Sequence, residues 1–127
     1  MGLEFVNKLP SPQEIREQFP LPAGLDRVKE ERDAQIRDVL TGKDSRFLVI
    51  IGPCSADNEH AVLDYVTRLA AVQEKVKERL ILIPRVYTNK PRTTGEGYKG
   101  LLHQPDPEKK PNMYEGLISI LSMHMHL

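Results

Sequence analysis

The only cysteine of the chain and one of its arginines each follow a short apolar segment. Cys54 comes after residues 47–51, and Arg85 comes after residues 80–83, with a proline directly before each. A thiolate is a nucleophile and a soft metal ligand, whereas a guanidinium binds carboxylate and phosphate groups. If the two segments are neighbouring parallel strands, their carboxyl ends meet at one edge of the sheet, where ligands bind in such folds. We therefore expect Cys54 and Arg85 to face the same site.

Three interpretations of Cys54 remain open from its position alone. It can be a small apolar filler at the end of a strand, the common case for a buried cysteine. It can be a nucleophile, for which His60 is the nearest base in the sequence. It can also be a metal ligand at the catalytic end of the strand, with the remaining ligands supplied by other strands.

Positive charge is concentrated in the segment that follows the second apolar run. Residues 85–99 carry four cations and one anion, whereas the whole chain has 18 basic and 18 acidic residues. Arginine and lysine side chains, threonine hydroxyls and glycine-exposed amides together form a receptor for phosphate or carboxylate. Pro91 restricts the backbone between Lys90 and Arg92. A solvated basic loop is the alternative, but an arginine ending a buried strand is costly unless an anion meets it.

The remaining composition excludes several classes of partner. A net charge of zero gives no global field to attract nucleic acid or a membrane surface. The basic segment has no aromatic residue at positions 88–97 on which bases of a single strand could stack. His124 and His126 are two positions apart, on different faces of a helix, so we expect no metal site there. One cysteine fits a reducing compartment, and we expect a cytoplasmic protein with no nucleic-acid or membrane partner.

The elements that position these residues form a strand–helix–strand unit. Residues 47–51 and 80–83 are continuous apolar runs, which predict parallel strands buried on both faces. Between them, apolar residues recur at helical spacing from Val62 to Val76, and Ser55 or Asp57 can cap the start of that helix. This order predicts an α/β fold built from the βαβ unit of a parallel sheet.

Helical segments flank this unit on both sides. The capping box at Ser11 and Glu14 predicts a short helix over residues 12–18, and a second helix runs from Leu25 to the stop at Thr41-Gly42. We assign residues 1–45 to a helical N-terminal extension and residues 46–127 to the α/β part. A long loop over residues 88–113 precedes a helix over residues 114–126; a loop of this length is usually functional.

Four short motifs, taken in order, resemble one enzyme family. They are Gly52-Pro53-Cys54-Ser55, Pro84-Arg85-Val86-Tyr87, Lys90-Pro91-Arg92-Thr93-Thr94 and Gly97-Tyr98-Lys99-Gly100. The set resembles type I 3-deoxy-D-arabino-heptulosonate-7-phosphate (DAHP) synthase, a transferase that condenses phosphoenolpyruvate with erythrose 4-phosphate in the shikimate pathway to the aromatic amino acids. The resemblance implies the front portion of a TIM (β/α)8 barrel: the N-terminal extension and the first two βα units.

The resemblance also implies roles for particular residues. Cys54 corresponds to a ligand of a divalent metal ion of the Mn, Fe, Co or Zn type. Arg85 and Lys90 correspond to contacts of phosphoenolpyruvate, and Lys90 to a catalytic residue. The erythrose 4-phosphate contacts correspond to Lys90, Pro91, Arg92 and Thr93. The parent enzyme is expected to be a homo-oligomer.

Members of this family continue through six further strands that carry three more metal ligands. We therefore expect this chain to be a truncated form that is inactive alone. Two alternatives remain: a non-catalytic anion-binding or regulatory module, and the sister synthase that uses arabinose 5-phosphate. The segment from Lys90 to Thr94 argues against the sister synthase.

Overall fold

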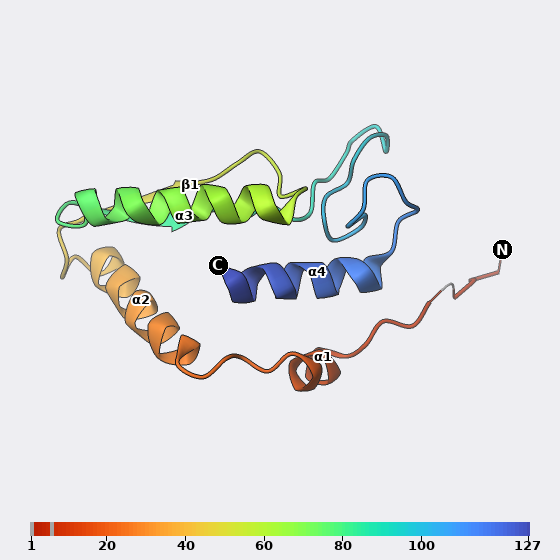
Figure 1. Ribbon diagram of the computed structural model, residues 1–127, viewed down its shortest axis with the longest axis horizontal. Helices are drawn as coiled ribbons and strands as arrows, with labels where there is room; N and C mark the ends of the chain where they lie inside the picture. Colours follow the sequence, from red (N-terminus) through yellow and green to blue (C-terminus); the bar gives the residue numbers. More distant parts are fainter. Residues whose placement is uncertain (1, 6) are drawn as a thin grey trace.

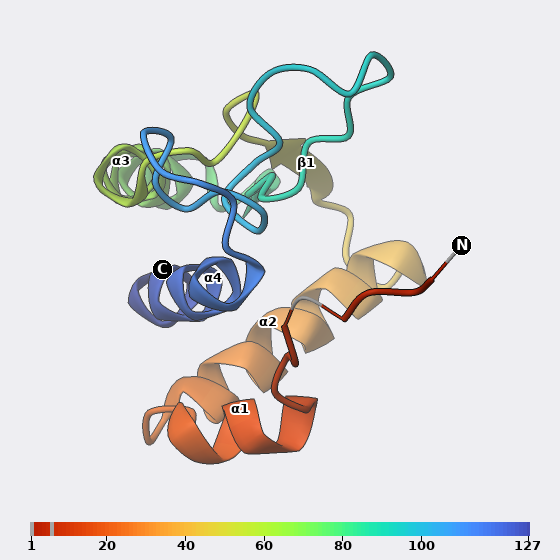
Figure 2. The same cartoon turned by 90° about the vertical axis from the view of Figure 1, so that its right-hand side faces the viewer.

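The computed structural model describes residues 2–5 and 7–127, so residues 1 and 6 of the predicted extension lie outside the described residues. Its elements, in chain order, are α1 (Pro12–Gln18), α2 (Leu25–Leu40), β1 (Phe47–Ile51), α3 (Glu59–Val76), β2 (Leu80–Pro84) and α4 (Met113–His126). Figures 1 and 2 show α3 running along the strands with α4 beside it, and α1 and α2 apart from both. Every element predicted from the sequence is present.

The two strands pair in parallel, as the strand–helix–strand order predicts. The register runs from Phe47 opposite Leu80 to Ile51 opposite Pro84. At the two ends of the ladder, Phe47 N–H donates to the Arg79 carbonyl and Arg85 N–H donates to the Ile51 carbonyl, both at 2.9 Å. The carboxyl ends of β1 and β2 therefore lie next to each other, and the residues that follow them begin at one edge.

A small core lies where α3, α4 and the loop after β2 meet. Ala56, Val62, Leu101 and Met123 are buried, and Val66, Val86 and Ile120 pack against them. These residues come from the turn after β1, both helices and the long loop. Burial of the loop residue Leu101 fixes part of the long loop to the sheet unit and α4, because this apolar side chain has left water.

The start of α3 differs from the prediction. Its N-cap is Asn58, whose side-chain oxygen accepts a hydrogen bond from Ala61 N–H at 3.0 Å, rather than Ser55 or Asp57. The N-cap prediction is wrong because several polar residues precede this helix, and each has an oxygen suited to the role. The later start leaves residues 52–58 as a turn between the strand and the helix.

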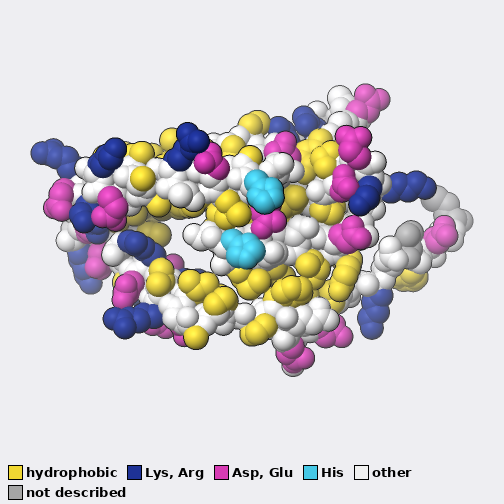
Figure 3. All heavy atoms as spheres, in the orientation of Figure 1, with side chains coloured by type: hydrophobic (Ala, Val, Ile, Leu, Met, Phe, Trp, Pro, Cys, Tyr) yellow, Lys and Arg dark blue, Asp and Glu magenta, His cyan; other side chains and the backbone are white. Residues whose placement is uncertain are grey.

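The prediction that both strands are buried on two faces is also wrong for this chain. Phe47 is 70% exposed and Ile50 is 68% exposed, and Ile81 is the one buried strand residue among those described. Helix α3 packs against β2, and α2 makes only a small contact with β1, so the described residues leave much of β1 uncovered. Figure 3 shows hydrophobic side chains gathered over the lower helices of this view and charged side chains along its margins.

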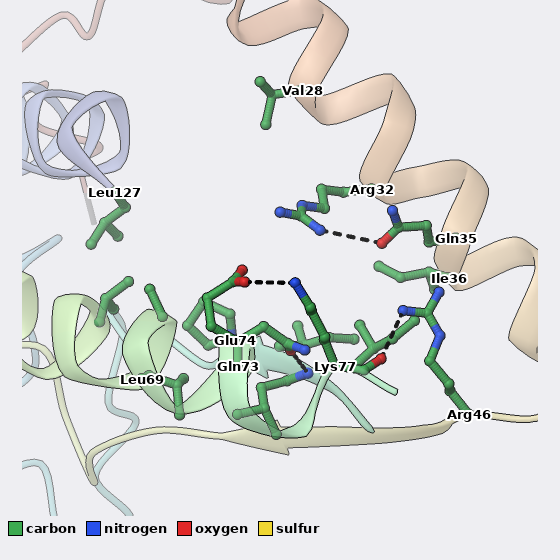
Figure 4. A pocket seen from close by; sticks show the side chains of 16 residues that line it. Val28, Arg32, Gln35, Ile36, Arg46, Leu69, Gln73, Glu74, Lys77 and Leu127 are labelled. Atoms are coloured by element: carbon green, nitrogen blue, oxygen red, sulfur yellow. Dashed lines mark hydrogen bonds and ion pairs between the residues drawn. The ribbon is translucent and has the colours of Figure 1, made fainter. Parts of the chain in front are cut away.

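A groove of about 560 Å³ separates α2 from α3 and β2. Figures 3 and 4 show this opening, which is lined by apolar side chains such as Val28 and Leu69 and by polar ones such as Gln73. The Gln73 side-chain amide donates to the Leu80 carbonyl at 2.9 Å, and its oxygen accepts from Leu82 N–H at 2.6 Å. One side chain of α3 therefore satisfies two backbone groups of β2.

Within the described residues, no helix has both the length and the apolar character that a membrane crossing requires. Helices α1 and α2 bury none of their residues. The capping box predicted at Ser11 is present, since Glu14 N–H donates to its hydroxyl oxygen at 3.2 Å. Local signals of this kind, rather than packing, set the ends of α1.

Candidate functional site

The turn after β1 lies directly against the residue that ends β2. Arg85 donates from its guanidinium Nη1 to the Pro53 carbonyl at 3.2 Å. A Cβ atom placed on Gly52 would lie only 2.0 Å from the Arg85 carbonyl oxygen, so no side chain fits at this position. The glycine of this turn therefore allows the two strand ends to touch, and the predicted meeting of Cys54 and Arg85 at one edge is supported.

Arg85 itself is exposed, contrary to the prediction of a costly buried position. Its guanidinium carbon lies 4.4 Å from the centroid of the Tyr87 ring, which is within cation–π range. The ring and the Pro53 carbonyl hold the guanidinium at the edge of the sheet. One face of the guanidinium lies over the ring and one N–H donor is used by Pro53, while the remaining donors are available to an anion.

Lys90 and Cys54 are brought together although 36 positions separate them. The Lys90 ammonium Nζ donates to the Cys54 sulfur at 3.2 Å. Cys54 is exposed, so the interpretation as a buried apolar filler does not fit. A base at His60 is not part of this contact, because the partner of the sulfur is the Lys90 ammonium.

The rest of the basic segment folds back on itself. Arg92 Nε donates to the Tyr98 carbonyl at 3.0 Å, and Gly95 N–H donates to the Arg92 carbonyl at 3.1 Å. Pro91 and Thr93 are exposed. Arg92 and Thr93 therefore lie on a tight loop whose side chains face solvent, beside the contact between Lys90 and Cys54.

The site carries uncompensated positive charge. Within the described residues, no carboxylate lies within ion-pair distance of the four cations of this segment, which are Arg85, Lys90, Arg92 and Lys99. Elsewhere, cations such as Lys109 pair with a neighbouring carboxylate. A local excess of this kind attracts anionic ligands, so the arrangement suits phosphorylated or carboxylated molecules.

Tyr98 adds a polar group that the sequence reasoning did not single out. Its hydroxyl is buried and has no hydrogen-bond partner among the described residues. Burial raises the pKa of this hydroxyl, and the nearby Asp57 carboxylate adds to the increase. The glycines on either side of the Tyr98-Lys99 pair marked a turn, but nothing in the sequence indicated that the ring would turn inward.

A complete metal site is not formed by the described residues. They contain no group of three or more histidine, cysteine, aspartate or glutamate side chains arranged to hold a metal ion. Cys54 offers one thiolate, and its near neighbour is the cationic Lys90. Two of the histidines have other partners: His126 Nδ1 lies 3.2 Å from the Glu59 carboxylate, and His124 Nδ1 lies 2.7 Å from the Ile120 carbonyl. These residues alone therefore do not fit a divalent ion.

Known proteins resemble this chain in sequence and in structure. A family model described as the DAHP synthetase I family matches residues 20–120. The phenylalanine-inhibited phospho-2-dehydro-3-deoxyheptonate aldolase of Saccharomyces cerevisiae is 40% identical over 110 residues, covering 86% of this chain and 29% of that protein. The phospho-2-dehydro-3-deoxyheptonate aldolase of Amycolatopsis methanolica is 38% identical over 112 residues, covering 88% of this chain and 55% of that protein.

A solved structure agrees with the sequence comparison. The phospho-2-dehydro-3-deoxyheptonate aldolase of Francisella tularensis superposes with a TM-score of 0.84 at 27% identity, covering 98% of this chain and 37% of that one. The fold is thus the front part of that enzyme's fold, as expected. The chain spans 29% and 55% of the two relatives named above. The match over most of its length shows that this chain belongs to the DAHP synthetase I family.

Proposed function

We propose that this chain supplies part of the active site of a DAHP synthase. That enzyme would condense phosphoenolpyruvate with erythrose 4-phosphate, giving DAHP and phosphate, at the start of aromatic amino-acid biosynthesis. The observation that carries the proposal is the contact of Lys90 with Cys54 at the edge where both strands end. Around it lie the uncompensated cations that two phosphorylated substrates require.

The cations divide between the two substrates. Arg85 and Lys90 would bind phosphoenolpyruvate, because Arg85 keeps donors free beyond its contact with Pro53 and Lys90 lies beside it along the same edge. Lys90, Pro91, Arg92 and Thr93 would bind erythrose 4-phosphate through the exposed loop. The catalytic role belongs to Lys90: its ammonium can neutralise negative charge that develops on either substrate as the new carbon–carbon bond forms.

A divalent ion of the Mn, Fe, Co or Zn type belongs to the same proposal. Cys54 would supply one soft ligand, and the other ligands would come from polypeptide other than these 127 residues. The described residues alone do not complete the site of this ion. A cytoplasmic location fits the single cysteine, and a homo-oligomer of longer chains completes the proposal.

Two alternatives make different predictions. The sister synthase would accept arabinose 5-phosphate in place of erythrose 4-phosphate. A non-catalytic module would bind anions without forming a product. Pro91, Arg92 and Thr93 are exposed, and neither Lys90 nor Arg92 pairs with a carboxylate among the described residues. This favours a sugar phosphate as ligand, and therefore an enzyme over the non-catalytic module.

A chimera tests the proposal directly. The segment of the Phe-sensitive Escherichia coli relative that aligns with this chain (37% identical over 117 residues) is replaced by this chain, and formation of DAHP is measured. We expect metal-dependent product with erythrose 4-phosphate and little with arabinose 5-phosphate. The 127-residue chain alone serves as the negative control, because one thiolate cannot hold a divalent ion in a defined geometry.

The outcomes separate the three functions. A folded chimera that forms no DAHP, although it binds phosphoenolpyruvate, would support the non-catalytic module. A preference for arabinose 5-phosphate would support the sister synthase. A folded chimera that neither binds phosphoenolpyruvate nor forms product would refute the anion site itself.

A further inference from the structure

We infer that Gly100 is a positioning residue for Lys90, an inference that rests on the proposed function for its catalytic meaning. The long loop leaves the sheet through residues 88–90 and comes back through residues 99–103, which we call the returning arm. Gly100 lies where the two segments touch. Its lack of a side chain allows the returning arm to hold Lys90 at the distance from which the ammonium meets Cys54.

Backbone hydrogen bonds join the two segments on both sides of Gly100. Lys90 N–H donates to the Lys99 carbonyl at 2.8 Å, and Leu102 N–H donates to the Thr88 carbonyl at 3.0 Å. The residue whose side chain reaches Cys54 is thus fixed at its own amide. The position of the Lys90 ammonium therefore depends on where the returning arm lies.

The contact between Gly100 and residues 88–90 leaves room for a glycine but not for a residue with a side chain. A Cβ atom on Gly100 would lie 2.4 Å from the Thr88 carbonyl oxygen and 2.9 Å from Lys90 N. Its φ of +100° is also one that residues with a side chain rarely adopt. Gly95 provides the contrast: its φ is +74°, but a Cβ there would meet nothing within 4 Å.

The returning arm cannot move away to relieve such a clash. Leu101 is only 4% exposed and belongs to the core. On the far side, Gly116 of α4 packs so closely that a Cβ there would lie 1.9 Å from the Leu102 carbonyl oxygen. The arm is held between α4 and residues 88–90, so a side chain at Gly100 must displace the segment that carries Lys90.

A side-chain contact fastens the same junction at its outer edge. His103 Nε2 lies 3.2 Å from the Asn89 side-chain oxygen, next to Lys90 in the sequence. Asn89 is exposed, His103 is partly buried, and neither belongs to the core, so removal of this contact leaves the core intact. Its removal is a second way to weaken the contact between residues 88–90 and the returning arm, and it perturbs the structure less than a substitution of Gly100 does.

The distance between Lys90 and Cys54 can be measured chemically without any enzyme activity. o-Phthalaldehyde condenses with an amine and a thiol to a fluorescent isoindole, and within one molecule it does so only where the two groups are close. Because the chain has one cysteine, every intramolecular isoindole must contain Cys54. We expect dilute wild-type chain to fluoresce, and Lys90→Arg and Cys54→Ala to lose the signal.

The decisive variant is Gly100→Ala, with Gly95→Ala as its matched control. We expect Gly100→Ala to lose most of the isoindole signal while its circular dichroism stays that of the wild type, and Gly95→Ala to keep the signal. His103→Ala should reduce the signal in part, and this variant decides the matter if Gly100→Ala does not fold. An unchanged signal in Gly100→Ala, or in His103→Ala where only that variant folds, would overturn the inference. Absence of a signal from wild-type chain would do the same.

The proposed function fails by a different measurement. Loss of the isoindole signal in Gly100→Ala supports the positioning role whether or not the chimera makes DAHP. In an active chimera, Gly100→Ala should lower kcat/KM, as Lys90→Ala does, whereas kcat/KM of Gly95→Ala should stay near that of the parent chimera. Product formation in the chimera with an undiminished isoindole signal in Gly100→Ala would keep the function and refute the positioning role.

Discussion

Lys90 and Arg92 lie two positions apart in the sequence but have different surroundings. The Lys90 ammonium points to the Cys54 sulfur, whereas the Arg92 guanidinium bends back to the Tyr98 carbonyl. Pro91 stands between them and limits the backbone. This geometry gives Lys90 a place at the strand ends and gives Arg92 a place on the loop, so each would meet a different group of the substrates.

Removal of either cation should reduce catalysis strongly in the active chimera. We expect Lys90→Ala and Arg92→Ala to lower kcat/KM by about 100-fold or more, because each removes a charge placed to meet an anionic substrate. Lys109→Ala is the control, since Lys109 lies outside this cluster and pairs with Asp106 at the surface. Steady-state kinetics with each substrate varied in turn measure the effect; values close to those of Lys109→Ala would remove the residue from the site.

Cys54 can be tested through metal dependence. In the chimera, Cys54→Ala should abolish metal-dependent product formation, and Cys54→Ser should retain weak activity, because a hydroxyl is a poorer ligand than a thiolate for soft ions. Bound metal is measured in parallel by elemental analysis of the purified variants. Full metal content and full activity in Cys54→Ala would show that the thiol is not a ligand.

Asp44 gives a prediction for pH dependence at the start of β1. Hydrogen bonds from Arg46 hold the pKa of the Asp44 carboxyl below its ordinary value. Folding therefore favours the ionised carboxylate of Asp44. This contribution to the free energy of unfolding is fully present above the ordinary carboxyl pKa, and it is lost as the pH falls through the lowered pKa of the folded chain. We expect Asp44→Asn to be less stable than wild type near neutral pH and equally stable in strong acid.

Urea unfolding across this pH range measures the difference. Asp64→Asn is the matched control, because the pair of Asp64 with Arg68 is much more exposed than the pair of Asp44 with Arg46. A constant difference between Asp44→Asn and wild type from neutral to acid pH would contradict the ionisation argument.

At the scale of single residues, the sequence predicted the strand-end positions and missed the contacts made by the loop. Cys54 and Arg85 could be placed at one edge because each follows an apolar strand. The approach of Lys90 to Cys54 could not be predicted, since it depends on the path of a loop after β2. The same holds for Tyr98, whose burial results from that path.

At the scale of elements, the predicted boundaries agree with the structure where a local signal ends the element. Helix α1 covers Pro12–Gln18 and β1 covers Phe47–Ile51, as predicted. The capping box and the Gly52-Pro53 pair act within a few residues, so they can be read from the sequence. The cap of α3 at Asn58 was missed because neighbouring polar residues offer the same capping chemistry.

Gln73 of α3 provides a prediction at this scale. Arg79 and Arg85, the odd-numbered residues that flank β2, bond to β1 through their backbones. Because backbone groups alternate in direction along a strand, the even-numbered Leu80 and Leu82 present theirs to the opposite edge. The Gln73 side chain bonds to both residues, as the backbone of a residue in an adjacent parallel strand would do. We expect Gln73→Met to lower the free energy of unfolding by about 1–3 kcal/mol, because two half-buried backbone groups lose their partners.

Chemical denaturation followed by circular dichroism measures this loss, because the chain has no tryptophan for a fluorescence signal. Gln35→Met is the matched control: Gln35 lines the same groove from α2 but contacts Arg32 rather than a strand. We expect a change within about 0.5 kcal/mol for Gln35→Met. Equal effects of the two substitutions would show that the contact of Gln73 with β2 does not stabilise the sheet.

For the whole molecule, the exposed strand residues determine how the chain behaves in solution. Phe47 and Ile50 are exposed on β1, which has a partner strand on one side only. Exposed apolar edge strands favour association between copies. We expect the 127-residue chain to associate as its concentration rises, and the double variant Phe47→Lys with Ile50→Lys to shift towards monomer.

Sedimentation velocity over a concentration series tests this expectation. Leu40→Lys is the control, because Leu40 is 75% exposed but lies at the end of α2, away from the sheet. A wild-type chain that stays monomeric at every concentration and melts cooperatively would contradict it. If Leu40→Lys dissociates the chain as well as the double variant does, α2 rather than β1 forms the contact.

The bond between Lys90 and Cys54 also has a consequence for the order in which the chain folds. It closes a loop of 36 residues that contains all of α3 and β2. Closing such a loop costs chain entropy, which the crossover helix and the strand pairing must offset first. The ammonium and the thiol therefore meet late in folding, after the sheet has formed, and they separate early when the chain opens locally. Loss of this bond would thus report partial opening of the molecule before its helices melt.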